Sequence, residues 1–177
     1  MGGTLKLSLG VILLLSLVAA AGAEQRVITF DALPTTACND PWVETGCQME
    51  AVTQTGADCY PVSPGCFISQ YAGGIYIAAR LNVALTTMVG IESIEIDILE
   101  GWEIGCTRAF LYAGETQMAY TASDDIGAGM MVLDATSGLP DRLAISGHES
   151  AVLEVRLIGS NITPAAESSW GMIKTRY

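Results

Sequence analysis

The sequence predicts an all-β protein, built as an antiparallel β-sandwich or jelly roll with disulfide-pinned loops. Short segments that alternate apolar and polar residues recur along the chain, and Gly, Pro, Asn and Asp separate them. No long segment keeps a helical period between capping signals. Because side chains of an extended strand point alternately to its two faces, the alternating segments are typical of half-buried strands.

The first 23 residues have the order of a secretory signal peptide. Lys6 is their only charge, residues 7–18 are mostly apolar, and small residues follow up to Ala23. The apolar run is shorter than the ~20 residues that a membrane-spanning helix needs. We therefore expect cleavage after Ala23, no membrane span afterwards, and one β-sandwich domain of residues 24–177 (177 − 23 = 154 residues). The expected location is secreted and extracellular, with the periplasm as the alternative.

Two segments carry the clearest strand pattern. In residues 94–98 three isoleucines alternate with Glu95 and Asp97, and residues 152–157 repeat the alternation. The other predicted strands span residues 26–30, 48–54, 75–85, 108–113, 117–121, 130–134, 142–145 and 170–176. About ten strands at this spacing indicate a sandwich or jelly roll. A helix over residues 78–88 remains the alternative for that stretch.

Five cysteines follow the signal peptide. In an oxidising compartment disulfides are the default, and the spacing favours two local loops, Cys38–Cys47 and Cys59–Cys66. This pairing leaves Cys106, which could be buried, free, or the link of an intermolecular disulfide in an oligomer.

The chain is strongly acidic, with a formal net charge of −11. Without the signal peptide, 7 Lys and Arg oppose 19 Asp and Glu, which gives 7 − 19 = −12. Such a surface repels nucleic acid and anionic lipid. Neutral polysaccharide, cations or an extracellular protein are therefore the expected partners, although the charge also serves solubility alone.

Three segments resemble exported bacterial β-sandwich proteins of the PEP-CTERM type and their relatives with galactose-binding-like jelly rolls. Residues 27–34 (VITFDALP) resemble the opening strand of that class, residues 43–46 (VETG) its entry to a second strand, and residues 93–97 (SIEID) a strand in mid-chain. The carboxy-terminal anchor of the PEP-CTERM class does not match residues 170–177, so a free secreted relative is expected.

The resemblance also implies a structural calcium ion as an alternative to a protein with no cofactor. Carbohydrate-binding members hold calcium with carboxylates of the first and last strands. Asp31 fits the first position, whereas the last predicted strand offers Ile173 and Lys174.

Glu95, Asp97 and Glu100 form a run similar to the E-x-D-x-x-E signature of laminarinase-type glycoside hydrolases. The resemblance implies that Glu95 is the nucleophile, Asp97 the orienting acid and Glu100 the acid/base. Retaining hydrolysis needs two carboxyl groups ~5–5.5 Å apart, which a bulge at Leu99 would allow. The alternative is that Glu95 and Asp97 form the solvated face of an amphipathic strand.

Three further motifs have a structural and a chemical interpretation. Asp124 and Asp125 precede glycines and suit a turn or a hard cation. His148, the only histidine, lies between two serines but without a nucleophile elbow, so it is expected in an exposed turn rather than a catalytic triad. A zinc site is disfavoured because the chain has no Cys-x-x-Cys pair.

Aromatic residues near the predicted loops indicate ligand contact, because sugars stack on aromatic rings. Four residues are the candidate ligand-binding set: Trp42, Tyr60, Tyr71 and Tyr76. The sequence therefore favours a secreted, non-catalytic β-sandwich module that binds a glycan or a protein at the cell surface or in the matrix. A laminarinase-like hydrolase and a structural extracellular subunit are the alternatives.

Overall fold

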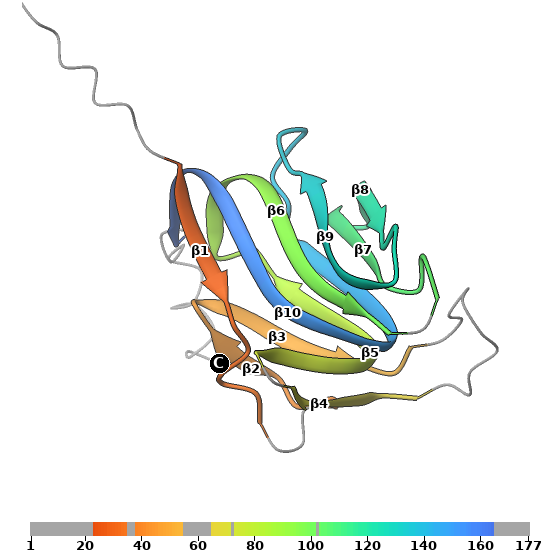
Figure 1. The fold of residues 1–177 in the computed structure, drawn as a ribbon. Helices are drawn as coiled ribbons and strands as arrows, with labels where there is room; N and C mark the ends of the chain where they lie inside the picture. The colour runs from red at the N-terminus through yellow and green to blue at the C-terminus, as the bar shows by residue number, and fades with distance from the viewer. Residues whose placement is uncertain (1–22, 35–37, 55–64, 72, 102, 165–177) are drawn as a thin grey trace, which may run out of the picture.

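The structure, a computed structural model, describes residues 23–34, 38–54, 65–71, 73–101 and 103–164. These residues form ten strands and no helix (Figure 1). The strands are β1 (Glu24–Ile28), β2 (Trp42–Glu44), β3 (Cys47–Val52), β4 (Phe67–Tyr71), β5 (Gly74–Ala84), β6 (Met88–Glu100), β7 (Arg108–Ala113), β8 (Thr116–Ala122), β9 (Gly127–Asp134) and β10 (Arg142–Pro164). Predictions for residues 1–22, Cys59, Tyr60, and the strand at 170–176 with Ile173 and Lys174 lie outside the described residues.

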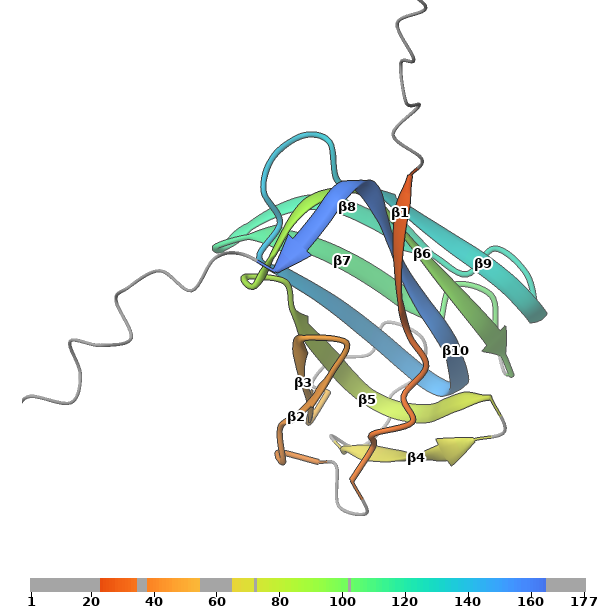
Figure 2. The same cartoon turned by 90° about the vertical axis from the view of Figure 1, so that its left-hand side faces the viewer.

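The strands form one antiparallel sheet that folds into two facing halves (Figure 1, Figure 2). The first half has the order β1, β10, β6, β9. The second half has the order β2, β3, β5, β10, β7, β8. Strands β3 and β4 share one edge of β5, where β3 pairs with residues 80–83 and β4 pairs with residues 74–78. This is the all-β antiparallel sandwich that the alternating segments predicted.

Strand β10 belongs to both halves. Residues 142–146 pair with β5 on one side and β7 on the other, whereas residues 155–159 lie between β1 and β6. The register shifts between Gly147 and Ser150, where Glu149 has a positive φ of 55°. A bulge bends a strand and increases its twist, and this one lies where β10 leaves one half for the other.

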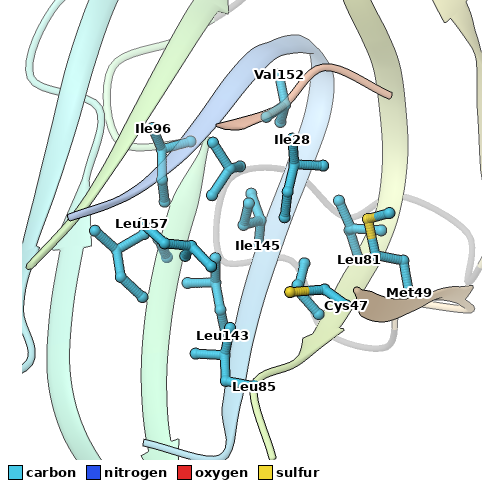
Figure 3. Close-up of a cluster of buried hydrophobic side chains, with 14 of the residues drawn as sticks. Ile28, Cys47, Met49, Leu81, Leu85, Ile96, Leu143, Ile145, Val152 and Leu157 are labelled. Carbon is cyan, nitrogen blue, oxygen red and sulfur yellow. The ribbon is translucent and has the colours of Figure 1, made fainter. Parts of the chain in front are cut away.

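The inward faces of the two halves form a single apolar core (Figure 3). Strands β6 and β10 supply isoleucine, leucine and valine from the first half, and β3, β5 and β7 supply the facing residues. Ten of these buried side chains are labelled in Figure 3: Ile28, Cys47, Met49, Leu81, Leu85, Ile96, Leu143, Ile145, Val152 and Leu157. The alternation in each strand thus fixes which face is buried.

The strand predictions that fall within the described residues are confirmed, with three differences. Strands β2 and β4 were not predicted, because one has three residues and the other has no clear alternation. The two segments predicted at 142–145 and 152–157 are parts of the single strand β10. Residues 78–84 are strand rather than helix. None of the described residues belongs to a helix long and apolar enough to cross a membrane.

Two of the motifs that resemble exported sandwich proteins contact each other. The Glu44 carboxylate accepts hydrogen bonds from the backbone N–H groups of Thr29, Phe30 and Ala32, at 2.8, 2.9 and 3.3 Å. The Thr45 hydroxyl donates to the Val27 carbonyl. Glu44 therefore supplies hydrogen-bond acceptors to the backbone N–H groups of the turn that follows β1. This turn includes Phe30, which has a positive φ of 65°.

The predicted disulfide pairing is wrong. Cys38 bonds Cys66, across a sequence separation of 28, and Cys47 is a fully buried thiol in the core. Desolvation raises the pKa of Cys47 to about 11, partly offset by the positive charge of Arg26. Cys47 starts β3 on its inward face, whereas Cys38 lies against Ala51 near the other end of that strand. Cys106 is also buried, with 3% of its surface exposed.

Candidate functional site

Within the described residues, the outward surface of the second half carries six aromatic side chains. Phe67 and Tyr71 in β4 lie opposite Ala78 and Gly74 in β5, and Tyr76 lies opposite Ser69. Directly opposed residues in an antiparallel pair share a face, so these three rings project from the same side of the sheet. Across β10, Phe110 and Tyr112 in β7 and Tyr120 in β8 continue that side. We call this surface the aromatic face: Phe67, Tyr71, Tyr76, Phe110, Tyr112 and Tyr120, with the polar outward residues between them.

Phe110, Tyr112 and Tyr120 form a compact row of rings at the β7–β8 end. The ring centroids of Phe110 and Tyr120 are 5.1 Å apart, and those of Phe110 and Tyr112 are 6.4 Å apart with planes inclined by 27°. Both separations are typical of aromatic pairs that hold each other in place. Tyr120 is 51% exposed, so the row presents an open ring to solvent.

Two arginines reach over the same row from neighbouring strands. The Arg142 guanidinium lies 4.4 Å from the centroid of the Tyr112 ring, and that of Arg80 lies 5.9 Å from it. Ala144, in register between Asn82 and Phe110, faces the same side yet is fully buried. The longer side chains therefore cover the sheet at its centre and hold their charges in fixed positions.

Polar atoms on this face lack partners. Within the described residues, Asn82 Oδ1 and Arg80 Nε are buried and accept or donate no hydrogen bond. A buried polar atom without a partner costs about 1–3 kcal/mol, so these two atoms are energetically unfavourable in the structure as it stands.

A pocket of about 400 Å³ opens beside Asn82. Its walls come from β3, β5, the β7–β8 turn and the start of β10, and include Glu50, Asn82, Glu115, Asp141 and Arg142. Convergent polar groups next to aromatic surface are typical of small-ligand sites.

The four aromatic residues proposed from the sequence have different positions. Tyr71 and Tyr76 lie on the aromatic face, at the β4 end. Tyr60 lies outside the described residues. Trp42 is only 7% exposed and belongs to the core, opposite the inward Met49, so the expectation that it presents an open ring is wrong. Its buried Nε1 has no hydrogen-bond partner in the described part of the chain.

Glu95 and Asp97 project from the outer surface of the other half, where they surround one arginine. Arg156 Nε contacts Glu95 at 3.0 Å, its Nη2 contacts Asp97 Oδ1 at 2.8 Å, and its Nη1 contacts Glu154 at 2.9 Å. Arg156 binds both oxygens of Asp97. This is the solvated face of an amphipathic strand with an ion-pair network across β6 and β10, rather than a cleft with two unpaired carboxyl groups.

Glu100 points to the opposite side of β6. Its side chain is 1% exposed, and the alternation from Ile94 continues to it without a bulge, because the β6–β9 register is unbroken. The Glu95 and Glu100 carboxyl groups therefore lie on different faces of the strand. The geometry of a retaining glycosidase is absent from this pair.

The buried Glu100 carboxylate is fully hydrogen-bonded. It accepts from Thr107 N, Ser123 Oγ and Ser150 Oγ, each at 2.8 Å. Burial would raise the pKa of Glu100, but the bonds from Ser123, Thr107 and Ser150 outweigh it and hold the pKa below its ordinary value. The Glu100 carboxylate thus connects the end of β6 to Thr107 before β7, Ser123 after β8 and Ser150 in β10, which is a structural role.

Two of the candidate metal-binding residues, Asp31 and Asp125, have local hydrogen-bond partners. The Asp31 carboxylate accepts a hydrogen bond from Thr29 Oγ1, and the Asp125 carboxylate accepts one from the N–H of Ile126. The next residue, Gly127, has a positive φ of 100°. His148 is half-buried within β10 next to the bulge, rather than in the exposed turn that the sequence predicted. No cluster of three or more His, Cys, Asp or Glu suited to a metal ion occurs among the described residues.

Sequence reasoning missed Phe110, Tyr112 and Tyr120. The signal was present in the predicted strand at 108–113, where Arg108, Phe110 and Tyr112 alternate with the buried Ala109 and Leu111. What the sequence did not show is that β10 would bring Arg80 and Arg142 to the same surface.

Comparison with known proteins gives matches only among solved structures. No family model matches the chain, and no curated protein matches it. The chain is similar to a family 29 carbohydrate-binding module, with 16% identity over 81% of this chain and 90% of that one and a TM-score of 0.43. A variant of the module CBM29-2 gives the same identity and score, over 81% and 94%.

A third similar structure is the low-affinity xylan-binding module CBM86 from Roseburia intestinalis. The identity is 11% over 76% of this chain and 94% of that chain, and the TM-score is 0.41. Identities and scores at this level identify no residue of a site and no ligand.

Proposed function

We propose that the protein is a secreted, non-catalytic module that binds polysaccharide on the aromatic face. The observation that carries the proposal is the row of Phe110, Tyr112 and Tyr120 on an open sheet surface, next to a pocket of about 400 Å³. A pyranose ring has one apolar face that stacks on an aromatic ring, while its hydroxyl groups need polar partners. Asn82, Glu50 and Asp141 at the pocket supply both acceptors and donors.

The shape of the surface favours a polymer over a single sugar. Aromatic rings extend from Tyr71 and Tyr76 at one end to Tyr120 at the other, across β4, β5, β10, β7 and β8. Strands β5, β10 and β7 are paired on both sides, whereas β4 and β8 each pair with one described strand. The pairing of the three inner strands keeps their rings in place before binding. A preorganised surface loses less entropy when a ligand binds.

The amino-terminal sequence supports the proposed secretion, because it has the order of a signal peptide. A glycan-binding module in that location would attach to cell-surface or matrix polysaccharide. Hydrolysis is not proposed, because Glu95 is paired with Arg156 and Glu100 is buried on the other face of β6.

Removing the exposed ring of Tyr120 is expected to weaken binding by about tenfold, as for an aromatic residue on which a ligand stacks. The test is a polysaccharide array followed by calorimetry with Tyr120→Ala. The matched controls are Met130→Ala and Val132→Ala, which are 52% and 49% exposed on the outer surface of the first half. Retained affinity in Tyr120→Ala, or a wild-type protein that binds no polysaccharide, would contradict the proposal.

A further inference from the structure

The positive charges of this acidic protein are unevenly placed. The chain has a formal net charge of −11, and five arginines lie among the described residues. Three of the five, Arg80, Arg108 and Arg142, project from the aromatic face, because each lies opposite an outward residue of a neighbouring strand. The remaining two, Arg26 and Arg156, lie on β1 and on the part of β10 in the first half.

The arginines differ in what they bind. Arg156 is surrounded by three carboxylates, and Arg26 donates to the Ile162 carbonyl. Arg80 and Arg142, by contrast, have no ion pair with any described residue and contact the Tyr112 ring instead. Two guanidinium groups therefore remain available to an external anion.

Carboxylates of described residues occur near these arginines but form no ion pair with them. Glu50, Glu115 and Asp141 line the pocket together with Arg142, yet none lies within ion-pair distance of Arg142 or Arg80. Asp141 accepts from the N–H of Gly114 at the β7–β8 turn. The acids are thus placed to accept hydrogen bonds from sugar hydroxyl groups at the pocket, while the two guanidinium groups lie over the Tyr112 ring.

We propose that the ligand is an acidic polysaccharide whose sugar residues are uronic acids. The inference rests on the proposed function, because the sugar must stack on the aromatic face for its carboxylate to reach the arginines. The planar guanidinium matches a carboxylate in a bidentate pair, and a uronate ring carries that carboxylate beside the apolar face that stacks. The local charge of the surface that binds favours an anionic ligand, whereas the total charge led to the expectation of a neutral one.

The test compares three polymers, a polyuronate, a neutral β-glucan and a sulfated polysaccharide, by affinity electrophoresis and calorimetry. Wild-type protein is expected to bind the polyuronate best, and its affinity falls as salt is added. Arg142→Gln and Arg80→Gln each lower polyuronate affinity about tenfold. Arg26→Gln, which removes the same charge elsewhere, changes it less than twofold. Thermal unfolding of each variant verifies the fold.

Arg142→Lys serves as a second variant, since it keeps the charge but loses the planar fork, and an intermediate loss of affinity is expected. Binding of the neutral polymer that needs Tyr120 but neither arginine would overturn this inference and leave the proposed function intact. Equal affinity for the sulfated polymer would overturn the assignment of a carboxylate ligand. Failure to bind any of the three would overturn both proposals.

Discussion

Replacing Glu100 with alanine is expected to lower the free energy of unfolding by about 3 kcal/mol, roughly the cost of leaving several buried polar groups without a partner. The substitution removes the acceptor of three hydrogen bonds at once, from Thr107 N, Ser123 Oγ and Ser150 Oγ. All three donors belong to buried residues, so water replaces the lost partner poorly. Urea unfolding measures the difference.

Glu103→Ala is the matched control, because Glu103 is an exposed acid close in sequence. Its change in unfolding free energy should stay within about 0.5 kcal/mol, as for ordinary surface substitutions. Equal effects of the two substitutions would show that the Glu100 hydrogen bonds contribute nothing special to stability.

The same carboxylate makes stability depend on pH. The pKa of Glu100 is lower in the folded protein than in the unfolded chain, so the folded state binds its proton more weakly. The stabilisation is complete above the unfolded pKa of about 4.3 and is lost as the pH falls through the lowered folded pKa. In Glu100→Gln this part of the acid dependence disappears. If the loss of stability at acid pH were the same in Glu100→Gln as in the wild type, Glu100 would not be its source.

Removing the disulfide is expected to have the second large effect. The bond between Cys38 and Cys66 closes a loop with a sequence separation of 28, and loss of such a loop costs about 3.5 kcal/mol in the chain-entropy account. The loop contains β2 and β3, which pair with the edge of β5, so that edge should loosen first. The double variant Cys38→Ser/Cys66→Ser tests this by thermal unfolding.

Reductant provides the internal control for this prediction. Reduced wild-type protein should match the double variant in stability, and the double variant should not respond to reductant at all. A peptide map under non-reducing conditions identifies the pairing directly. Finding a Cys38–Cys47 bridge would contradict the structure, in which Cys47 is buried inside the sandwich.

Alternation along single strands explains why so much of the fold could be predicted. In residues 94–98 apolar and charged residues alternate, which predicts a buried and a solvated face. In the structure, burial along β6 alternates in the same way up to Glu100. The same pattern in Cys47, Met49 and Ala51 marks them as inward residues of β3. Short spacing between cysteines suggested a local bridge instead, and the burial pattern of the strand overruled it.

The site was harder to predict because it depends on which strands become neighbours. Arg80, Arg142 and Tyr112 are far apart in sequence and meet only because β10 lies between β5 and β7. Trp42 is in a strand of three residues, too short to show which side its ring would face, and pairing with Met49 turns it inward. Sequence periodicity gives the face of each residue, whereas strand order decides which faces combine.

Mapping the bound polysaccharide on the protein by NMR tests the central claim most directly. During a titration, the account predicts that amide and aromatic shifts change along β5, β7, β8 and the start of β10, with Tyr112 and Tyr120 among the largest. The outer surface of β6 and β9, around Arg156 and Met130, should stay unchanged. Shifts confined to that surface, or none with any polysaccharide, would contradict the account.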